Sequence, residues 1–161
     1  MKAKTAENIF PTEEEMKNAL RLALQKFFLN DSFLIHNDVH ERTLTFRLGI
    51  YLQELFPSWN VDCEYNRNRR AIKKITTCRE QPRAVFPDII IHRRGTAQNL
   101  LVIEAKKNAN KQDKEADIKK IEEYLNDPTL KYRYGLFLDF NDFCQETIQS
   151  LENNWWIGKN G

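Results

Sequence analysis

Two short apolar runs separated by a polar turn constrain the fold of this chain more than any other feature. Val85–His92 contains three consecutive isoleucines, and Leu100–Lys106 begins with Leu-Leu-Val-Ile. Runs of this length, rich in β-branched residues, are typical of strands that are buried on both faces. The stretch Arg93–Asn99 between them is polar and contains a glycine. It therefore predicts a turn that joins the two runs as an antiparallel hairpin.

A hairpin centred on Thr96 fixes which residues face each other, because the numbers of opposed residues then sum to 192. Asp88 falls opposite Glu104, and the side chains of such a pair share a face with Cβ atoms ~4.5–5.5 Å apart. Lys106 lies two residues beyond Glu104 and shares that face. The register therefore predicts two carboxylates and an ammonium group together at one end of an apolar sheet. A slip of one residue would separate them.

Two carboxylates at this separation repel each other unless a cation or a proton lies between them. Magnesium prefers oxygen ligands at ~2.0–2.1 Å, and an ion held by Asp88 and Glu104 could acidify a water and offset charge on a phosphodiester oxygen. Lys106 would then orient or activate the water, or stabilise the anionic transition state. The alternative is that the three side chains form a cross-strand salt-bridge cluster without a catalytic role.

The rest of the chain predicts helices on both sides of the hairpin. Thr12 and Glu15 form the S/T-x-x-E signal of a helix start, and this first helix runs from about residue 11 to 29 before Asn-Asp-Ser ends it. The other expected elements are a helix over 38–56, a strand over 61–65, a helix over 112–126, a strand over 132–140 and a helix over 142–151, with Trp155–Ile157 closing the core. We expect one domain over residues 1–161, in which 1–33 is a helical extension and 38–140 the core.

Pro87-Asp88 and Glu104-Ala105-Lys106 resemble the motif of the PD-(D/E)xK nuclease superfamily, which has the restriction-endonuclease-like fold. The resemblance implies a mixed α/β fold with core order α-β-β-β-α-β and a central mixed sheet flanked by helices. It also implies that Asp88 and Glu104 bind Mg²⁺ or Mn²⁺, that the backbone carbonyl of Ala105 joins them, and that Lys106 assists the attacking water.

Glu41 adds a carboxylate near the start of the second expected helix. It precedes Leu44 by three residues and Leu48 by seven, so it lies on the inward stripe, where a carboxylate needs a partner. The resemblance gives Glu41 a place at the metal, because many members of the superfamily carry a Glu on a helix ahead of the first core strand. Two alternatives stay open: Glu41 is a favourable charge at a helix N-terminus, or Glu64 supplies the extra carboxylate.

A basic segment, residues 67–83, separates the first expected strand from the hairpin. It holds seven basic residues against one acidic residue, a charge of +6, so the net charge of +2 leaves −4 for the rest of the chain. The segment shows no helical or strand period, so we expect a loop or a long hairpin tip. Such a concentration of charge predicts contact with a polyanion, and the alternative is a solvated loop that only aids solubility. The expected phosphate contacts are Arg67, Arg69, Arg70, Lys73 and Lys74, together with Lys120 of the helix over 112–126. The resemblance makes this helix the second core helix of the superfamily, which implies that Asp117 and Lys120 face the substrate groove.

The resemblance implies a divalent-metal-dependent nuclease or phosphodiesterase that hydrolyses nucleic acid, with DNA as the first expectation. A catalytically inactive module that binds nucleic acid or a partner protein on the same fold is the alternative. A lone domain without a recognition module acts with little sequence preference, dimerises, or works beside a targeting partner.

Composition adds an expectation about location. No apolar run approaches the ~20 residues that cross a membrane, and the N-terminus lacks a signal peptide's apolar stretch, so we expect no membrane partner. The three cysteines, Cys63, Cys78 and Cys144, form no CxxC pattern, which favours a reducing cytoplasm. We expect the histidines His36, His40 and His92 to be surface or core residues rather than metal ligands.

Overall fold

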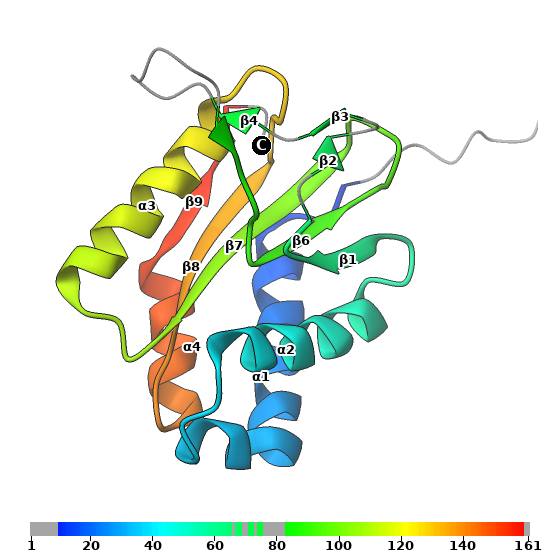
Figure 1. Ribbon diagram of the computed structural model, residues 1–161. Helices are drawn as coiled ribbons and strands as arrows, with labels where there is room; N and C mark the ends of the chain where they lie inside the picture. Colours follow the sequence, from blue (N-terminus) through cyan, green and yellow to red (C-terminus); the bar gives the residue numbers. More distant parts are fainter. Residues whose placement is uncertain (1–9, 66, 69–70, 73, 76–82, 160–161) are drawn as a thin grey trace, which may run out of the picture.

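The computed structural model describes residues 10–65, 67–68, 71–72, 74–75 and 83–159, and these form a mixed α/β fold (Figure 1). Its main sheet has the strand order β1-β6-β7-β8-β9, in which only β7 and β8 pair in parallel. The five strands are β1 (Asn60–Cys63), β6 (Ile89–His92), β7 (Asn99–Lys107), β8 (Tyr134–Phe140) and β9 (Trp155–Ile157). The helices in the described residues are α1 (Glu13–His36), α2 (Glu41–Leu55), α3 (Lys111–Asn126) and α4 (Cys144–Asn153).

Alternate residues of β7 face different layers of the molecule. Ile103 and its alternate neighbours belong to the larger apolar cluster, which also contains the buried side chains of α1 and α2 and Leu151 of α4. Val102 belongs to a second cluster on the opposite face, where Ile121 and Tyr124 of α3 cover the sheet. Glu104 has the same parity as Val102, so the alternation of a strand directs its side chain to the α3 face.

The register predicted for the hairpin is confirmed over three consecutive pairs. Ile89 faces Ile103, Ile90 faces Val102 and Ile91 faces Leu101. The register then shifts between Ile91 and His92, so that the part of the hairpin near the turn is offset from the part that carries Asp88.

The first helix is longer than the sequence predicts. Thr12 and Glu15 form the expected capping box, but α1 continues through 30–32 to His36 with only a kink, at which Asp31 leaves the helical region (φ −126°). Asp31 is held there by Tyr51, whose hydroxyl donates to its carboxylate at 2.5 Å. Ile35 beyond the kink is 1% exposed, so burial keeps the chain helical past residues that favour a break.

Several other predicted bounds of helices and strands were wrong by a few residues. The second helix begins only at Glu41, the first strand ends at Cys63 because Glu64 has a positive φ (49°), and the last helix begins at Cys144. Trp155–Ile157, which is expected to close the core, forms a strand that pairs with β8. No helix in the described part of the chain is both long and apolar enough to cross a membrane.

The basic segment forms two small antiparallel pairs in its described parts. They are β2 (Arg67–Asn68) with β3 (Ala71–Ile72), and β4 (Lys74–Ile75) with β5 (Arg83–Ala84). The sequence predicts a loop or a long hairpin tip here, and the described parts hold these two short antiparallel pairs. Three of the expected phosphate contacts, Arg69, Arg70 and Lys73, lie outside the described residues.

Gly135 allows α3 to pack unusually close to β8. A Cβ atom at this position would lie 2.5 Å from Cγ2 of Ile121 and 3.2 Å from Cδ1 of Leu125. We expect Gly135→Ala to lower the free energy of unfolding by about 1–3 kcal/mol, because the extra methyl forces the helix away from the sheet. Urea unfolding followed by circular dichroism measures the change.

Ile121→Ala is the matched partner for this substitution. It removes Cγ2, so the double variant should be less destabilised than the sum of the two single variants. Additive losses would show that Gly135 does not control the helix–sheet distance.

Candidate active site

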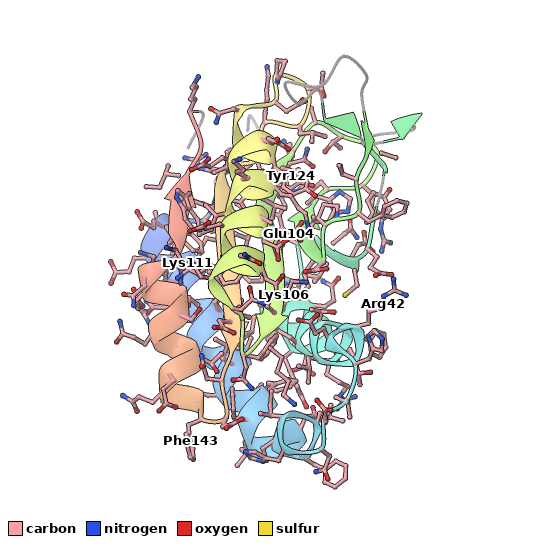
Figure 2. The ribbon with its side chains drawn as sticks, turned by 60° about the vertical axis from the view of Figure 1, so that its left-hand side comes forward. Arg42, Glu104, Lys106, Lys111, Tyr124 and Phe143 are labelled. Atoms are coloured by element: carbon pink, nitrogen blue, oxygen red, sulfur yellow. The ribbon has the colours of Figure 1, made fainter. Side chains whose placement is uncertain are left out.

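Glu104 is a charged residue in an apolar layer. It is 3% exposed on the α3 face of β7, where Tyr124 donates a hydrogen bond to its Oε1 at 3.1 Å. The Nζ atom of Lys120 lies 3.7 Å from its Oε2. Figure 2 shows Glu104, Lys106 and Tyr124 along one stretch between α3 and the sheet, while Phe143 lies at the far end of the molecule.

Asp88 is joined to β7 across the hairpin. Its Oδ2 accepts a hydrogen bond from the backbone N–H of Ala105 at 2.8 Å. Asp88 directly precedes the pair Ile89–Ile103, so extending that register by one residue sets it opposite Glu104. The predicted juxtaposition of these two acids is therefore present.

Burial makes both acids harder to ionise. Burial raises the pKa of Glu104 to about 8, and the nearby charge of Asp88 adds to this, while Lys120 and the Tyr124 hydrogen bond work in the other direction. Burial also raises the pKa of Asp88. A site that disfavours its own carboxylates in this way gains from binding a cation.

Lys106 and Glu41 form the end of the site nearest α2. The Nζ atom of Lys106 lies 3.6 Å from Oε1 of Glu41. The other carboxylate oxygen of Glu41 accepts a hydrogen bond from the backbone N–H of Lys107 at 2.9 Å. The partner that an inward carboxylate needs is therefore supplied by β7. Glu41 is also the first residue of α2, so its charge is favourable for the helix as well.

The helix α3 contributes more to the site than the sequence predicts. Asp117 is 2% exposed; its Oδ1 accepts from Lys120 at 2.6 Å, and its Oδ2 lies 3.8 Å from Nζ of Lys106. Tyr124, which lies in the helix expected over 112–126, is the hydrogen-bond partner of Glu104. Residues 117, 120 and 124 are three and four positions apart, so they lie on one face of the helix. This spacing could have predicted that Tyr124 joins Asp117 and Lys120 at the site.

Asp117 carries an oxygen without a hydrogen bond. Its Oδ2 is buried and has no hydrogen-bond partner, although the ammonium group of Lys106 lies nearby. An acceptor of this kind is costly to bury, so it indicates that a donor or a cation can reach this point.

The other candidate residues lie in separate interactions. Glu64, the rival carboxylate, forms an ion pair with Nε of Arg42 at 2.8 Å. His92 is buried and its Nε2 lies 2.7 Å from Oδ2 of Asp62. The pKa of Asp62 is held well below its usual range, because hydrogen bonds from Arg94 and His92 outweigh the effect of burial.

The oxygen donors at this site have the chemistry that Mg²⁺ or Mn²⁺ requires. The carboxylates of Asp88 and Glu104 are hard ligands, and Oδ2 of Asp117, which is buried without a hydrogen bond, lies 3.8 Å from the ammonium group of Lys106. Within the described residues there is no group of three or more His, Cys, Asp or Glu side chains placed to hold a metal. Magnesium is commonly held by one or two carboxylates with water and substrate phosphates, so two acids are sufficient for that mode.

Comparisons of this chain with protein-family models, curated proteins and solved structures find no match. The function is therefore argued from the geometry of the site.

The raised pKa of Glu104 makes stability depend on pH. Between the usual value of 4.5 and about 8, the folded protein keeps a proton that the unfolded chain has lost. Folding therefore becomes less favourable as the pH rises, by up to about 1.4 kcal/mol per pH unit. Relative to Glu104→Gln, which does not titrate, we expect the wild type to lose stability between pH 5 and pH 8 in urea unfolding.

Glu64→Gln is the control, because Glu64 is an exposed member of an ion pair. Its stability should follow that of the wild type across the same pH range. Parallel pH profiles for the wild type and Glu104→Gln would contradict the raised pKa.

Proposed function

We propose that this chain is a divalent-metal-dependent nuclease that hydrolyses phosphodiester bonds of nucleic acid, with DNA as the first substrate to test. The observation that carries the proposal is the closeness of Asp88, which directly precedes β6 and accepts a hydrogen bond from Ala105, to the buried Glu104 of β7, with Lys106 following on the same strand. The order α2-β1-β6-β7-α3-β8 supports a restriction-endonuclease-like core, since it is the order that the motif resemblance implies.

Each residue of the site would have a distinct role. Asp88, Glu104 and the Ala105 carbonyl would hold Mg²⁺ or Mn²⁺. Glu41, whose Oε1 lies 3.6 Å from Nζ of Lys106, would be a further acid at the metal. When bound, such an ion supplies a Lewis acid that offsets negative charge on the phosphate.

Lys106 is suited to act on the reacting groups. Its side chain is 31% exposed, so the ammonium group can meet a substrate, while Glu41 and Asp117 limit where it points. An ammonium group held in this way orients a water or stabilises the charge that develops on the phosphate.

A second candidate is a module on the same fold that binds nucleic acid or a partner protein without turnover. It is favoured by the ion pairs of the site, because Glu41, Glu104 and Asp117 each have a lysine within 4 Å. The two candidates differ in whether DNA is cleaved when a divalent cation is present.

Replacing Lys106 tests the catalytic role. We expect the wild type with Mg²⁺ or Mn²⁺ to nick or degrade DNA, and Lys106→Ala to slow cleavage by about 10²–10⁴-fold, because the charged group at the phosphate is lost. Gel electrophoresis of a DNA plasmid measures the rate, and circular dichroism confirms the fold.

Lys111→Ala is the matched control, since Lys111 is 89% exposed at the start of α3. It should cleave like the wild type. An active Lys106→Ala protein would remove the role given to Lys106, and a wild type that binds DNA without cleaving it would favour the binding module.

The metal role of Asp88 has its own test. We expect Mn²⁺ to bind the wild type in isothermal titration calorimetry and Asp88→Asn to weaken this by about tenfold or more, through loss of a charged ligand. Binding should tighten from pH 6 to pH 8, because the proton on Glu104 must leave before the ion can bind.

Glu122→Gln serves as the control, because it removes an exposed acid of α3 outside the site. If Glu122→Gln and Asp88→Asn bound Mn²⁺ equally, the ion would not lie at Asp88.

A further inference from the structure

Lys120 occupies an unusual position for a residue expected to contact substrate. Its Nζ atom donates to Oδ1 of Asp117 at 2.6 Å and lies 3.7 Å from Oε2 of Glu104. Both acids are almost completely buried, whereas 36% of the Lys120 side chain is exposed. The lysine therefore reaches from the edge of the site into its acidic centre.

The surroundings explain why a cation is held there. Two buried carboxylates without a counter-charge would be expensive to desolvate, and the protein as described supplies that charge from its own chain. A divalent ion bound by Glu104 would supply the same charge and would repel the ammonium group beside it. Lys120 and such an ion therefore compete for Glu104.

The side chain of Lys120 can also move away from Glu104. Its stem is long and flexible, and its side chain is partly exposed on α3. Asp117, one turn earlier on the helix, would keep it tethered near the site after it leaves Glu104. A lysine displaced to this edge is a suitable ligand for a phosphate.

We propose that Lys120 is exchanged at Glu104 for the divalent cation, and that the displaced ammonium group becomes available to a phosphate of the nucleic acid. This inference rests on the proposed function. Metal binding and nucleic-acid binding are then coupled, so each tightens the other by the same factor. Lys120 thus contacts Glu104 when no metal is bound, and a phosphate of the substrate when the metal is bound.

Calorimetry with Mn²⁺ tests the competition, with Lys119 as the matched control. Lys119 is an exposed lysine next to Lys120 on α3, so Lys119→Gln and Lys120→Gln remove the same charge from neighbouring positions. We expect Lys120→Gln to bind Mn²⁺ about tenfold more tightly than the wild type, and Lys119→Gln to bind like the wild type. Equal or weaker binding by Lys120→Gln would overturn the inference.

A measurement on the wild type does not depend on how well the variant folds. Acylation of lysines, read by mass spectrometry, should label Lys120 several-fold faster when Mg²⁺ is added, while the labelling of Lys119 stays constant. Unchanged labelling of Lys120 in a protein that binds Mg²⁺ would overturn the inference.

DNA binding tests the second half of the exchange. In a Lys106→Ala background, which should leave duplex DNA intact, we expect Mn²⁺ to tighten DNA binding several-fold in fluorescence anisotropy. Adding Lys120→Gln should abolish this gain, and adding Lys119→Gln should preserve it. A gain that survives Lys120→Gln, or no gain at all, would overturn the coupling.

The two proposals fail in different ways. A wild type that binds no divalent ion would end both the nuclease proposal and the exchange. A wild type that binds Mn²⁺ and cleaves DNA, but with an affinity insensitive to Lys120, would leave the nuclease proposal standing and end the exchange alone.

Discussion

The burial of Glu104 is the interaction on which the rest of the site depends. A carboxylate that is 3% exposed in an apolar layer must be protonated, hydrogen-bonded or paired with a cation. The fold offers Glu104 one hydroxyl from Tyr124 and one ammonium group from Lys120, both from the same helix. The position of α3 over the sheet is therefore an electrostatic requirement as well as a matter of packing.

Close contact between α3 and β8 makes that arrangement possible. Gly135 pairs with Val102 in the parallel register, and the missing side chain leaves room for Ile121 of α3. Ile121 lies next to Lys120 and one turn before Tyr124, so the closest point of approach is also where these two side chains leave the helix. One residue without a side chain thus brings two polar groups within reach of a buried acid.

The sequence predicted best the features that depend only on local periodicity and on the register of paired strands. The two apolar runs, the position of Asp88 opposite Glu104 and the inward placement of Glu41 all follow from period and spacing, and the structure has each of them. The hydrogen bond from Tyr124 to Glu104 could not be predicted, because it depends on how closely α3 packs against the sheet. The kink of α1 at Asp31 involves a hydrogen bond from Tyr51, which is 20 residues away, and no local sequence pattern records such a contact.

The register shift between Ile91 and His92 divides the β6–β7 hairpin into two parts with different registers. The half that carries Asp88 is held by three consecutive pairs, each with an isoleucine of β6, and the side chains of these pairs are completely buried. A slip there would carry Asp88 away from Glu104. The half near the turn is already offset by one residue. Residues could therefore be inserted into or removed from the Arg93–Gln98 turn, and the irregularity would absorb the change in length before it reached the acids. The outer end of this hairpin is free to diverge in length and shape while the inner end keeps its geometry.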